Sequence, residues 1–421
     1  MINIYPYQNE GAAWLKSKRT ALLADEMGLG KTCQGFIAAA VLGARNIGAI
    51  CPASLRINWQ RELVKFWPSD VALPKICVES YDMVTRGAMD GLKFDVLIVD
   101  ECHYGKNSTA KRTQAVFGKD GPVHRAGAIW CLSGTPTPNH PGELWPILAT
   151  LAPETITENG RRMSQTAFED RYCDIGWGRH GPVFRGGRNI DELRERIRPF
   201  VLRRTKKDVL PQLPPMTVNL LPLTDRQAVK AMEKAIPDEE RYAALAAMKD
   251  DGVEGLQDIA PFIATLRRVT GEAKVSVCLE WIEQFLAQRP DAKLVVFAHH
   301  LSVIDNLTSQ LGARAVTVTG ATHPKFRQAA VDSFQEREAV RVFIGQATAA
   351  GVGINLTAAD TVLFVEQSWT PATDEQAMMR IHRIGQENHC QAYYACLAAS
   401  LDETITQVAA RKAHDAEILF A

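Results

Sequence analysis

The sequence predicts an α/β protein of two lobes, each built on a doubly wound parallel sheet and carrying helical insertions. Apolar runs without polar alternation, such as Phe94–Val99 and Thr361–Val365, are typical of strands that are buried on both faces. Helix-like stretches separate these runs in both halves of the chain. With 421 residues, of which 46% are hydrophobic, the chain is long enough for two or three domains with large cores.

A glycine-rich segment, Ala24–Thr32 (ADEMGLGKT), follows the apolar run Ala21–Leu23 and precedes a helix-like stretch from Cys33 to Leu42. A strand, a glycine turn and a helix in this order form a phosphate cradle, in which backbone N–H groups and the helix dipole face the anion. Lys31 would reach the β- and γ-phosphates of a nucleotide, and the Thr32 hydroxyl would ligate Mg²⁺. An ordinary glycine turn is the alternative.

The segment departs from the full Walker pattern at one position, because Asp25 stands where that pattern has its first glycine. Upstream, Gln8 lies just before a helix-like stretch that begins at Gly11. Its amide offers one donor and one acceptor, as the edge of adenine requires, although a surface role is the alternative.

A pair of carboxylates, Asp100 and Glu101, follows the apolar run Phe94–Val99. Ligands of doubly wound sheets bind at the carboxyl ends of the strands, so Asp100 is placed to hold Mg²⁺. Glu101 could orient and deprotonate the water that attacks the γ-phosphate. The predicted cofactors are therefore ATP and Mg²⁺, and the predicted ATP-binding residues are Gln8, Glu26, Met27, Gly28, Leu29, Gly30, Lys31, Thr32 and Asp100.

Charge and cysteine content limit the class of protein. Lys+Arg and Asp+Glu balance at 48 each, so nucleic-acid binding requires a local basic surface. The nine cysteines form no CxxC pair, which fits a reducing compartment. No signal peptide and no run of eighteen apolar residues is evident, so we expect no membrane association. We expect a cytoplasmic protein.

The stretch Pro52–Trp59 follows the strand-like run Ile47–Cys51 and is expected to turn into a helix near Ser54. Ser54 could cap this helix and Trp59 could anchor a core. Alternatively, Ser54 and Asn58 could offer the helix N-terminus to a DNA phosphate. The residues alone leave both interpretations open.

Three motifs in the first lobe, DEMGLGKT at Asp25–Thr32, DECH at Asp100–His103 and SGTP at Ser133–Pro136, resemble those of superfamily-two motors of the Swi/Snf type. The resemblance implies two RecA-like lobes and a phosphate loop in which acidic residues replace the first Walker glycine. It also implies that nucleotide state is coupled to DNA through His103, Ser133, Thr135, Gly353 and Gln376.

Residues 161–207 contain thirteen Lys or Arg against six Asp or Glu, interleaved with aromatic residues. A concentrated basic surplus is typical of phosphate binding, although a solvated face is the alternative. The end of this segment, Arg198–Leu210, resembles the hallmark of the family between its lobes. We expect Arg203 and Arg204 to contact DNA.

The second lobe is expected to begin with a helical protrusion at about 224–270 and to continue as strands and helices. His299 and His300 follow the strand-like run Lys293–Phe297, and with no third ligand nearby a metal site is disfavoured. The segment Gln346–Thr357 resembles a family motif that contacts DNA and nucleotide. The DNA contacts predicted outside the basic segment are Ser54, Asn58, His299, Thr348 and Asn355.

Arg380 and Arg383 are three positions apart and would share one face of a helix. Two guanidinium groups placed in this way could neutralise charge on a transferring phosphoryl group, as arginine fingers do. A surface ion-pair ladder is the alternative, but RIHRIGQ at 380–386 resembles the family signature. The chain departs from the family pattern just before this signature, at Met378 and Met379, where family members usually have acidic residues.

The predicted domains are a first lobe at 1–210, with a helical basic insertion at about 151–207, and a second lobe at 211–421. Three segments, Phe168–Cys173, Thr270–Lys274 and Val296–His300, resemble the distant branch that contains the annealing helicases. The resemblance implies an ATP-dependent translocase or remodeller of duplex or forked DNA, without sequence readout, that anneals strands or regresses forks. We expect a monomer when free, and a protein partner is compatible with the sequence.

Three other functions are compatible with the sequence. A strand-separating helicase would need an aromatic wedge, which the sequence does not identify. A motor subunit could serve a partner nuclease or methylase in phage replication or defence. A non-hydrolysing scaffold is disfavoured, because all five residues expected at the reaction centre are present: Lys31, Asp100, Glu101, Arg380 and Arg383.

Overall fold

The protein is described from a computed structural model, which covers residues 4–178, 181–224, 226, 229–230, 260–347, 354–368, 371–398, 400 and 402. These residues fall into two compact units, which are described separately. The first contains the chain up to residue 175 together with 186–211, and the second contains 176–185 and the chain from 212 onward.

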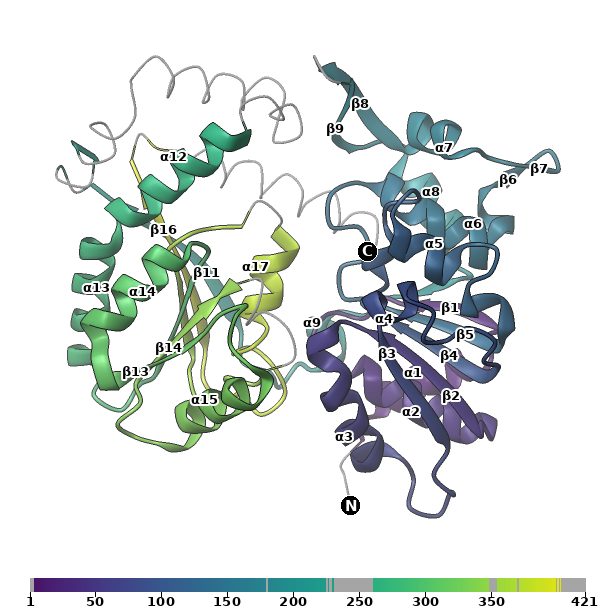
Figure 1. Cartoon of the computed structure of the whole chain (residues 1–421), viewed down its shortest axis with the longest axis horizontal. Helices are drawn as coiled ribbons and strands as arrows, with labels where there is room; N and C mark the ends of the chain where they lie inside the picture. Colours follow the sequence, from purple (N-terminus) through teal and green to yellow (C-terminus); the bar gives the residue numbers. More distant parts are fainter. Residues whose placement is uncertain are drawn as a thin grey trace. The chain divides into compact units, whose positions relative to one another are not determined.

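The first unit is built on a parallel sheet whose described strands run in the order β10–β1–β5–β4–β2–β3 (Figure 1). Alternate residues of β4 enter different packing layers. Leu97 and Val99 join the core that helices α5–α8 cover, while Ile98 faces Gly35 of α2. The strands are β1 (Thr20–Leu23), β2 (Asn46–Cys51), β3 (Lys75–Ser80), β4 (Phe94–Asp100), β5 (Ala126–Leu132) and β10 (Val201–Leu202).

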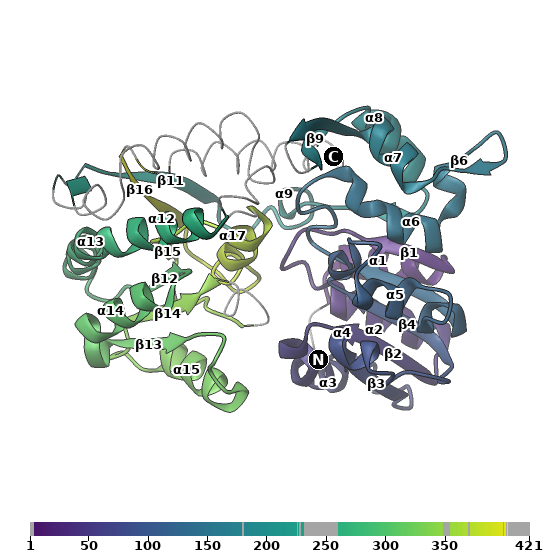
Figure 2. The ribbon, with the colours of Figure 1, turned by 45° about the horizontal axis from the view of Figure 1, so that its top comes forward.

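Helices pack against this sheet, and two short hairpins extend from the insertion after α6 (Figure 2). The helices are α1 (Pro6–Lys16), α2 (Lys31–Leu42), α3 (Arg56–Phe66), α4 (Tyr81–Thr85), α5 (Lys111–Phe117), α6 (Trp145–Leu151), α7 (Gln165–Tyr172), α8 (Ile190–Ile197) and α9 (Lys206–Val209). The hairpins pair β6 (Thr157–Glu158) with β7 (Arg161–Arg162) and β8 (Cys173–Gly178) with β9 (Gly181–Gly187).

The second unit has a parallel sheet whose described strands run in the order β11–β16–β15–β12–β14–β13. Its two faces bury separate apolar clusters, because Val296 enters one cluster while Val295 and Phe297 enter the other. Its strands are β11 (Met216–Leu223), β12 (Leu294–Ala298), β13 (Ala315–Val318), β14 (Val342–Gln346), β15 (Thr361–Phe364) and β16 (Cys390–Leu397), and its helices are α12 (Ala260–Ala273), α13 (Val275–Gln288), α14 (Leu301–Leu311), α15 (Pro324–Glu336) and α17 (Pro371–Met378).

The predicted fold class is confirmed, since both sheets are parallel and covered by helices. The helix expected near Ser54 is present, since residues 53–55 form a 3₁₀ turn that leads directly into α3. Exposed Ser54 makes no capping hydrogen bond among the described residues, so the capping interpretation is not realised. One local prediction was wrong. The insertion at 151–207 combines helices with hairpins rather than being helical throughout. Most of the helical protrusion predicted at about 224–270 lies outside the described residues, and its described end, from residue 260, is helical.

Candidate active site

The phosphate loop lies between the carboxyl end of β1 and the first turn of α2. Gly28 and Gly30 have φ angles of 88° and 73°, in the left-handed region that favours glycine. A Cβ atom on Gly30 would also lie 2.4 Å from Nε2 of Gln8. The glycines are therefore required by backbone shape and by close packing, which fits a cradle for phosphate oxygens.

The carboxylate of Asp25 anchors this loop from beneath. It is completely buried, and its two oxygens accept hydrogen bonds from Arg204 Nε at 3.1 Å and Nη2 at 2.5 Å. Gln34 of α2 donates a third hydrogen bond at 3.0 Å. The Arg204 guanidinium also donates to the carbonyl oxygen of Tyr7. Asp25, which replaces the first Walker glycine, therefore links the loop to α2 through Gln34 and to the residues after β10 through Arg204. Arg204 also contacts α1, through Tyr7.

The hallmark segment Arg198–Leu210 holds the phosphate loop. Arg203 donates to the carbonyl oxygens of Ala24 and Gly134, and the N–H of Lys206 donates to Glu26 Oε2 at 2.6 Å. The side chain of Arg204 is only 13% exposed. The prediction that Arg204 contacts DNA is therefore wrong for this structure, because its guanidinium is committed to the loop.

Three side-chain donors meet at the carbonyl oxygen of Leu29. These are Tyr7 Oη, Gln8 Nε2 and Gln34 Nε2, each at 3.2 Å. The Oε1 atom of Gln8 accepts the N–H of Tyr5 at 3.1 Å, so both ends of this amide bind the chain itself. Gln8 thus fixes the loop from α1, and its contact with adenine stays a prediction.

Lys31 places its ammonium group within the loop. Its Nζ donates to the carbonyl oxygens of Asp25 at 2.7 Å and Glu26 at 3.3 Å. Burial lowers the pKa of Lys31, while the charges of Glu101, Asp25 and Asp100 act in the opposite direction. The next residue, Thr32, is partly exposed at the first turn of α2, as the predicted metal contact requires.

Asp100 ends β4, and each of its carboxylate oxygens accepts one hydrogen bond. Trp59 Nε1 donates to Oδ2 at 2.8 Å, and the N–H of Glu101 donates to Oδ1 at 3.0 Å. Burial, followed by the charge of Glu101, raises the pKa of Asp100 to about 7, although Trp59 and Lys31 favour the ionised form. A buried carboxylate of this kind fits a divalent cation, whose charge would offset the desolvation.

Glu101, His103 and Ser133 form a connected group beside Asp100. Glu101 has a φ of 49°, and its Oε2 lies 3.3 Å from Nδ1 of His103. The same Nδ1 lies 3.0 Å from Ser133 Oγ, which also accepts the N–H of Thr135 at 3.1 Å. Burial lowers the pKa of His103. The structure therefore brings together the predicted catalytic carboxylate and three of the predicted coupling residues.

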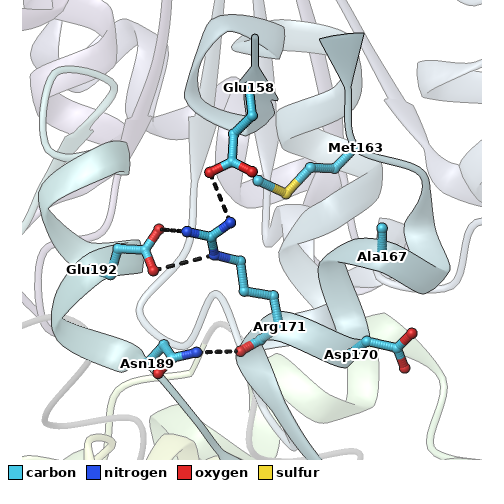
Figure 3. A pocket seen from close by; sticks show the side chains of 7 residues that line it. All are labelled: Glu158, Met163, Ala167, Asp170, Arg171, Asn189 and Glu192. Carbon is cyan, nitrogen blue, oxygen red and sulfur yellow. Dashed lines mark hydrogen bonds and ion pairs between the residues drawn. The ribbon is translucent and has the colours of Figure 1, made fainter.

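Part of the basic surplus of residues 161–207 is paired within the fold. Arg171 lies between two carboxylates, with 2.7 Å contacts to Glu158 and Glu192 (Figure 3). Arg196 contacts the same two carboxylates at 2.6 Å and 3.1 Å. Together with Arg204, these arginines have carboxylate partners within the fold, so their charge is neutralised there. The DNA contact of the other basic residues of the segment stays a prediction.

The first turn of α3 and the 3₁₀ turn before it carry two predicted DNA contacts. Ser54 is exposed, and Asn58 is partly exposed with its amide donating to Glu62 Oε1 at 3.0 Å. Neither residue is buried in the core, unlike Trp59 in the same turn. Their contact with DNA stays a prediction.

The predicted residues of the second unit follow the carboxyl ends of its strands. His299 is partly exposed after β12, and its N–H donates to Glu366 Oε2 at 2.8 Å. His300 binds the same carboxylate through Nδ1 at 2.6 Å, which gives this histidine a structural role. Asn355 is exposed. Thr348 and Gly353 lie outside the described residues.

The expected helical placement of Arg380 and Arg383 is wrong, because α17 ends at Met378. Both arginines lie in the turns that follow, where Arg380 Nε donates to the carbonyl oxygen of Gln376 at 3.0 Å. Buried Gln386 organises these turns through both ends of its side-chain amide. Nε2 donates to the carbonyl oxygens of Thr357, Ala359 and Ile381, and Oε1 accepts the N–H groups of Glu387 and Asn388.

Comparison with known proteins agrees with this geometry. Residues 7–271 match the model of the SNF2-related domain, and residues 277–385 match that of the helicase conserved C-terminal domain. The chain belongs to the SNF2-related family. This family of helicase-like ATPases accounts for the phosphate loop, the DECH motif and the RIHRIGQ turn together. Within the described residues, no helix combines the length and apolar character needed to cross a membrane.

Two curated relatives and one solved structure illustrate the similarity. The chain is 30% identical to the Xenopus tropicalis SWI/SNF-related matrix-associated actin-dependent regulator of chromatin subfamily A-like protein 1, over 95% of this chain and 43% of that protein. It is also 30% identical to the human DNA annealing helicase and endonuclease ZRANB3, over 97% of this chain and 40% of that protein. The chain therefore spans less than half the length of these relatives. A Sulfolobus solfataricus SWI2/SNF2 ATPase core in complex with dsDNA aligns with a TM-score of 0.43 and 24% identity, over 100% of this chain and 93% of that one.

Sequence reasoning missed a buried carboxylate in the second unit. Asp374 is 4% exposed, and its Oδ2 accepts the N–H of Ser368 at 2.9 Å. Its Oδ1 is buried without a hydrogen-bond partner among the described residues. Burial raises the pKa of Asp374 to about 7, against a smaller opposing effect of Arg267. Aspartate is usually exposed in a helix, so the sequence does not predict that Asp374 is buried.

We expect Asp374→Asn to raise the unfolding temperature more at pH 8 than at pH 5. The folded-state pKa is above the ordinary value, so wild-type stability from this group is present at low pH and lost between about pH 4 and 7. The asparagine carries no charge to desolvate. Thermal unfolding from pH 5 to 8.5 measures this difference, and a pH-independent difference would contradict it.

We expect Arg204→Ala to destabilise the first unit by about 3–5 kcal/mol, because it leaves the Asp25 carboxylate buried and unpaired. The control is Arg198→Ala, since Arg198 is 77% exposed and its ion pair with Glu195 is worth about 0–1 kcal/mol. Denaturant unfolding measures both. Equal stability of the two variants would show that the Asp25–Arg204 pair does not anchor the loop.

Proposed function

We propose that this chain hydrolyses ATP with Mg²⁺ and uses the energy to move along duplex or forked DNA. The observation that carries the proposal is the cluster at the carboxyl edge of the first sheet. There the ammonium group of Lys31 lies within the electrostatic reach of Asp100 and Glu101. A phosphate loop, a metal-binding carboxylate and a candidate base at one sheet edge support phosphoryl transfer.

In this proposal the loop N–H groups and Lys31 hold the phosphates of ATP, while Thr32 and Asp100 hold Mg²⁺. The metal would supply positive charge against the charge that develops on the phosphoryl oxygens. Glu101 orients water and accepts its proton, since its carboxylate lies beside the reaction edge and has no competing hydrogen bond at Oε2 among the described residues. Arg380 and Arg383 are proposed to stabilise the transferring phosphoryl group.

The Glu101–His103–Ser133 connection suggests how the reaction could be coupled to DNA. A change in the position or charge of Glu101 would alter its electrostatic contact with His103, and His103 in turn contacts Ser133, which accepts the N–H of Thr135. Gln376 and Gly353 are proposed as coupling residues of the second lobe on the family resemblance. The resulting coupling would make hydrolysis and lobe motion interdependent.

DNA binding is proposed to occur through phosphates, without sequence readout. The exposed or partly exposed residues proposed for these contacts are Ser54, Asn58, His299 and Asn355. Thr348 is included among the proposed DNA contacts on the family resemblance. Arg203 is instead proposed to support the phosphate loop, to which it donates a hydrogen bond. The name of the human relative includes annealing of DNA, so we propose strand annealing or fork remodelling as the outcome of translocation. A DNA-associated location follows from this proposal.

We expect Glu101→Gln to retain ATP binding and to lower the turnover number about 10²–10⁴-fold, because the amide cannot accept the proton of the attacking water. Glu154→Gln, at an exposed carboxylate of the same unit, is the control and should behave as wild type. A fluorescent ATP analogue measures binding and phosphate release measures turnover. Full turnover in Glu101→Gln would refute the assigned role.

We expect duplex or forked DNA to stimulate the steady-state ATPase more strongly than single-stranded DNA. The comparison requires fixed salt, because phosphate-driven binding weakens steeply as salt rises. Stimulation by single strands alone would instead support a strand-separating helicase. No stimulation by any DNA would contradict the proposed motor.

A further inference from the structure

Trp59 connects three elements of the first unit in its buried interior. It is 1% exposed and belongs to α3, which also carries Asn58 and follows the 3₁₀ turn that contains Ser54. Its ring meets Phe36 of α2 edge to face, with centroids 5.1 Å apart. Its indole Nε1 donates a hydrogen bond of 2.8 Å to Oδ2 of Asp100 at the end of β4.

The hydrogen bond to Asp100 is the feature that distinguishes Trp59 from a residue that only packs in the core. A buried indole N–H requires an acceptor, and here the acceptor is a carboxylate whose other oxygen is held by the N–H of Glu101. The two donors approach different oxygens, so together they fix the rotation of the carboxylate plane. Proteins commonly orient a metal-binding side chain in this way, by hydrogen bonds from neighbouring residues that do not bind the metal themselves.

We propose that Trp59 is a positioning residue that sets the orientation of the Asp100 carboxylate for Mg²⁺ and makes this orientation depend on α3. The proposal rests on the ATP·Mg²⁺ site proposed above. Its consequence is a short route from the predicted DNA contacts Ser54 and Asn58 to the metal. A shift of α3 would move the indole N–H relative to the Asp100 carboxylate and so change the orientation of that carboxylate.

The test replaces the indole by a ring without a donor. Trp59→Phe keeps an aromatic ring against Phe36 but removes the hydrogen bond to Asp100. The matched control is Trp130→Phe in β5, since Trp130 is equally buried and its Nε1 donates to the carbonyl oxygen of Lys18 at 3.2 Å. Both variants lose one buried indole N–H in the same unit, so thermal unfolding shows whether their stability losses are comparable.

The first readout is binding of a fluorescent ATP analogue in EDTA and over a Mg²⁺ titration. We expect Trp59→Phe to bind as wild type in EDTA and to need about tenfold more Mg²⁺ for half of the metal-dependent gain, the effect of one hydrogen bond to a charged group. Trp130→Phe should need the wild-type concentration. Identical Mg²⁺ curves for the two variants would overturn the proposal and leave Trp59 as a packing residue.

The second readout repeats the Mg²⁺ titration with duplex DNA at fixed salt. We expect DNA to lower the Mg²⁺ concentration for half-saturation in wild type and Trp130→Phe, and to have no such effect in Trp59→Phe. An equal DNA effect in all three proteins would overturn the link to α3. If wild-type protein shows no Mg²⁺-dependent nucleotide binding at all, the proposed ATP site fails, and this result is distinguishable from both outcomes above.

Discussion

The buried contact between Asp25 and Arg204 is the constraint on which the first unit depends. Asp25 is completely buried, so its charge is tolerable only because Arg204 binds both of its oxygens. Arg204 follows β10, a strand that returns to the sheet beside β1 after almost the whole unit has been built. The phosphate loop therefore has its observed shape only when the end of the unit has packed against its beginning.

The same contact explains why sequence reasoning succeeded for the loop and failed for the arginines. Gly28, Gly30 and Lys31 act through local backbone shape and reach, which a short motif specifies. Arg204 acts through a partner 179 positions away, and a basic surplus in the sequence does not distinguish a neutralised arginine from an exposed one. The helix expected around Arg380 failed for a related reason, since buried Gln386 fixes turns that local propensity does not reveal.

The parallel sheets were predictable because their strands are continuous apolar runs, and Val295–Phe297 show why. Neighbouring residues of this strand are buried in different cores on the two faces of the sheet, so the strand sequence is apolar throughout and does not alternate with polar residues. The Trp59–Asp100 hydrogen bond was not predictable. Motifs identify Asp100 by its place after a strand, whereas the donor comes from a helix whose exact rotation depends on packing against α2.

Gln386 also bears on how other chains with this signature should be interpreted. Its amide hydrogens point at three carbonyl oxygens and its oxygen receives two N–H groups, so a glutamate of the same shape would set carboxylate oxygens against carbonyl oxygens. The two arginines before it would then lose the turn that presents them. In a homologue with glutamate at this position we therefore expect the turns around Arg380 and Arg383 to take another conformation, even where both arginines are kept.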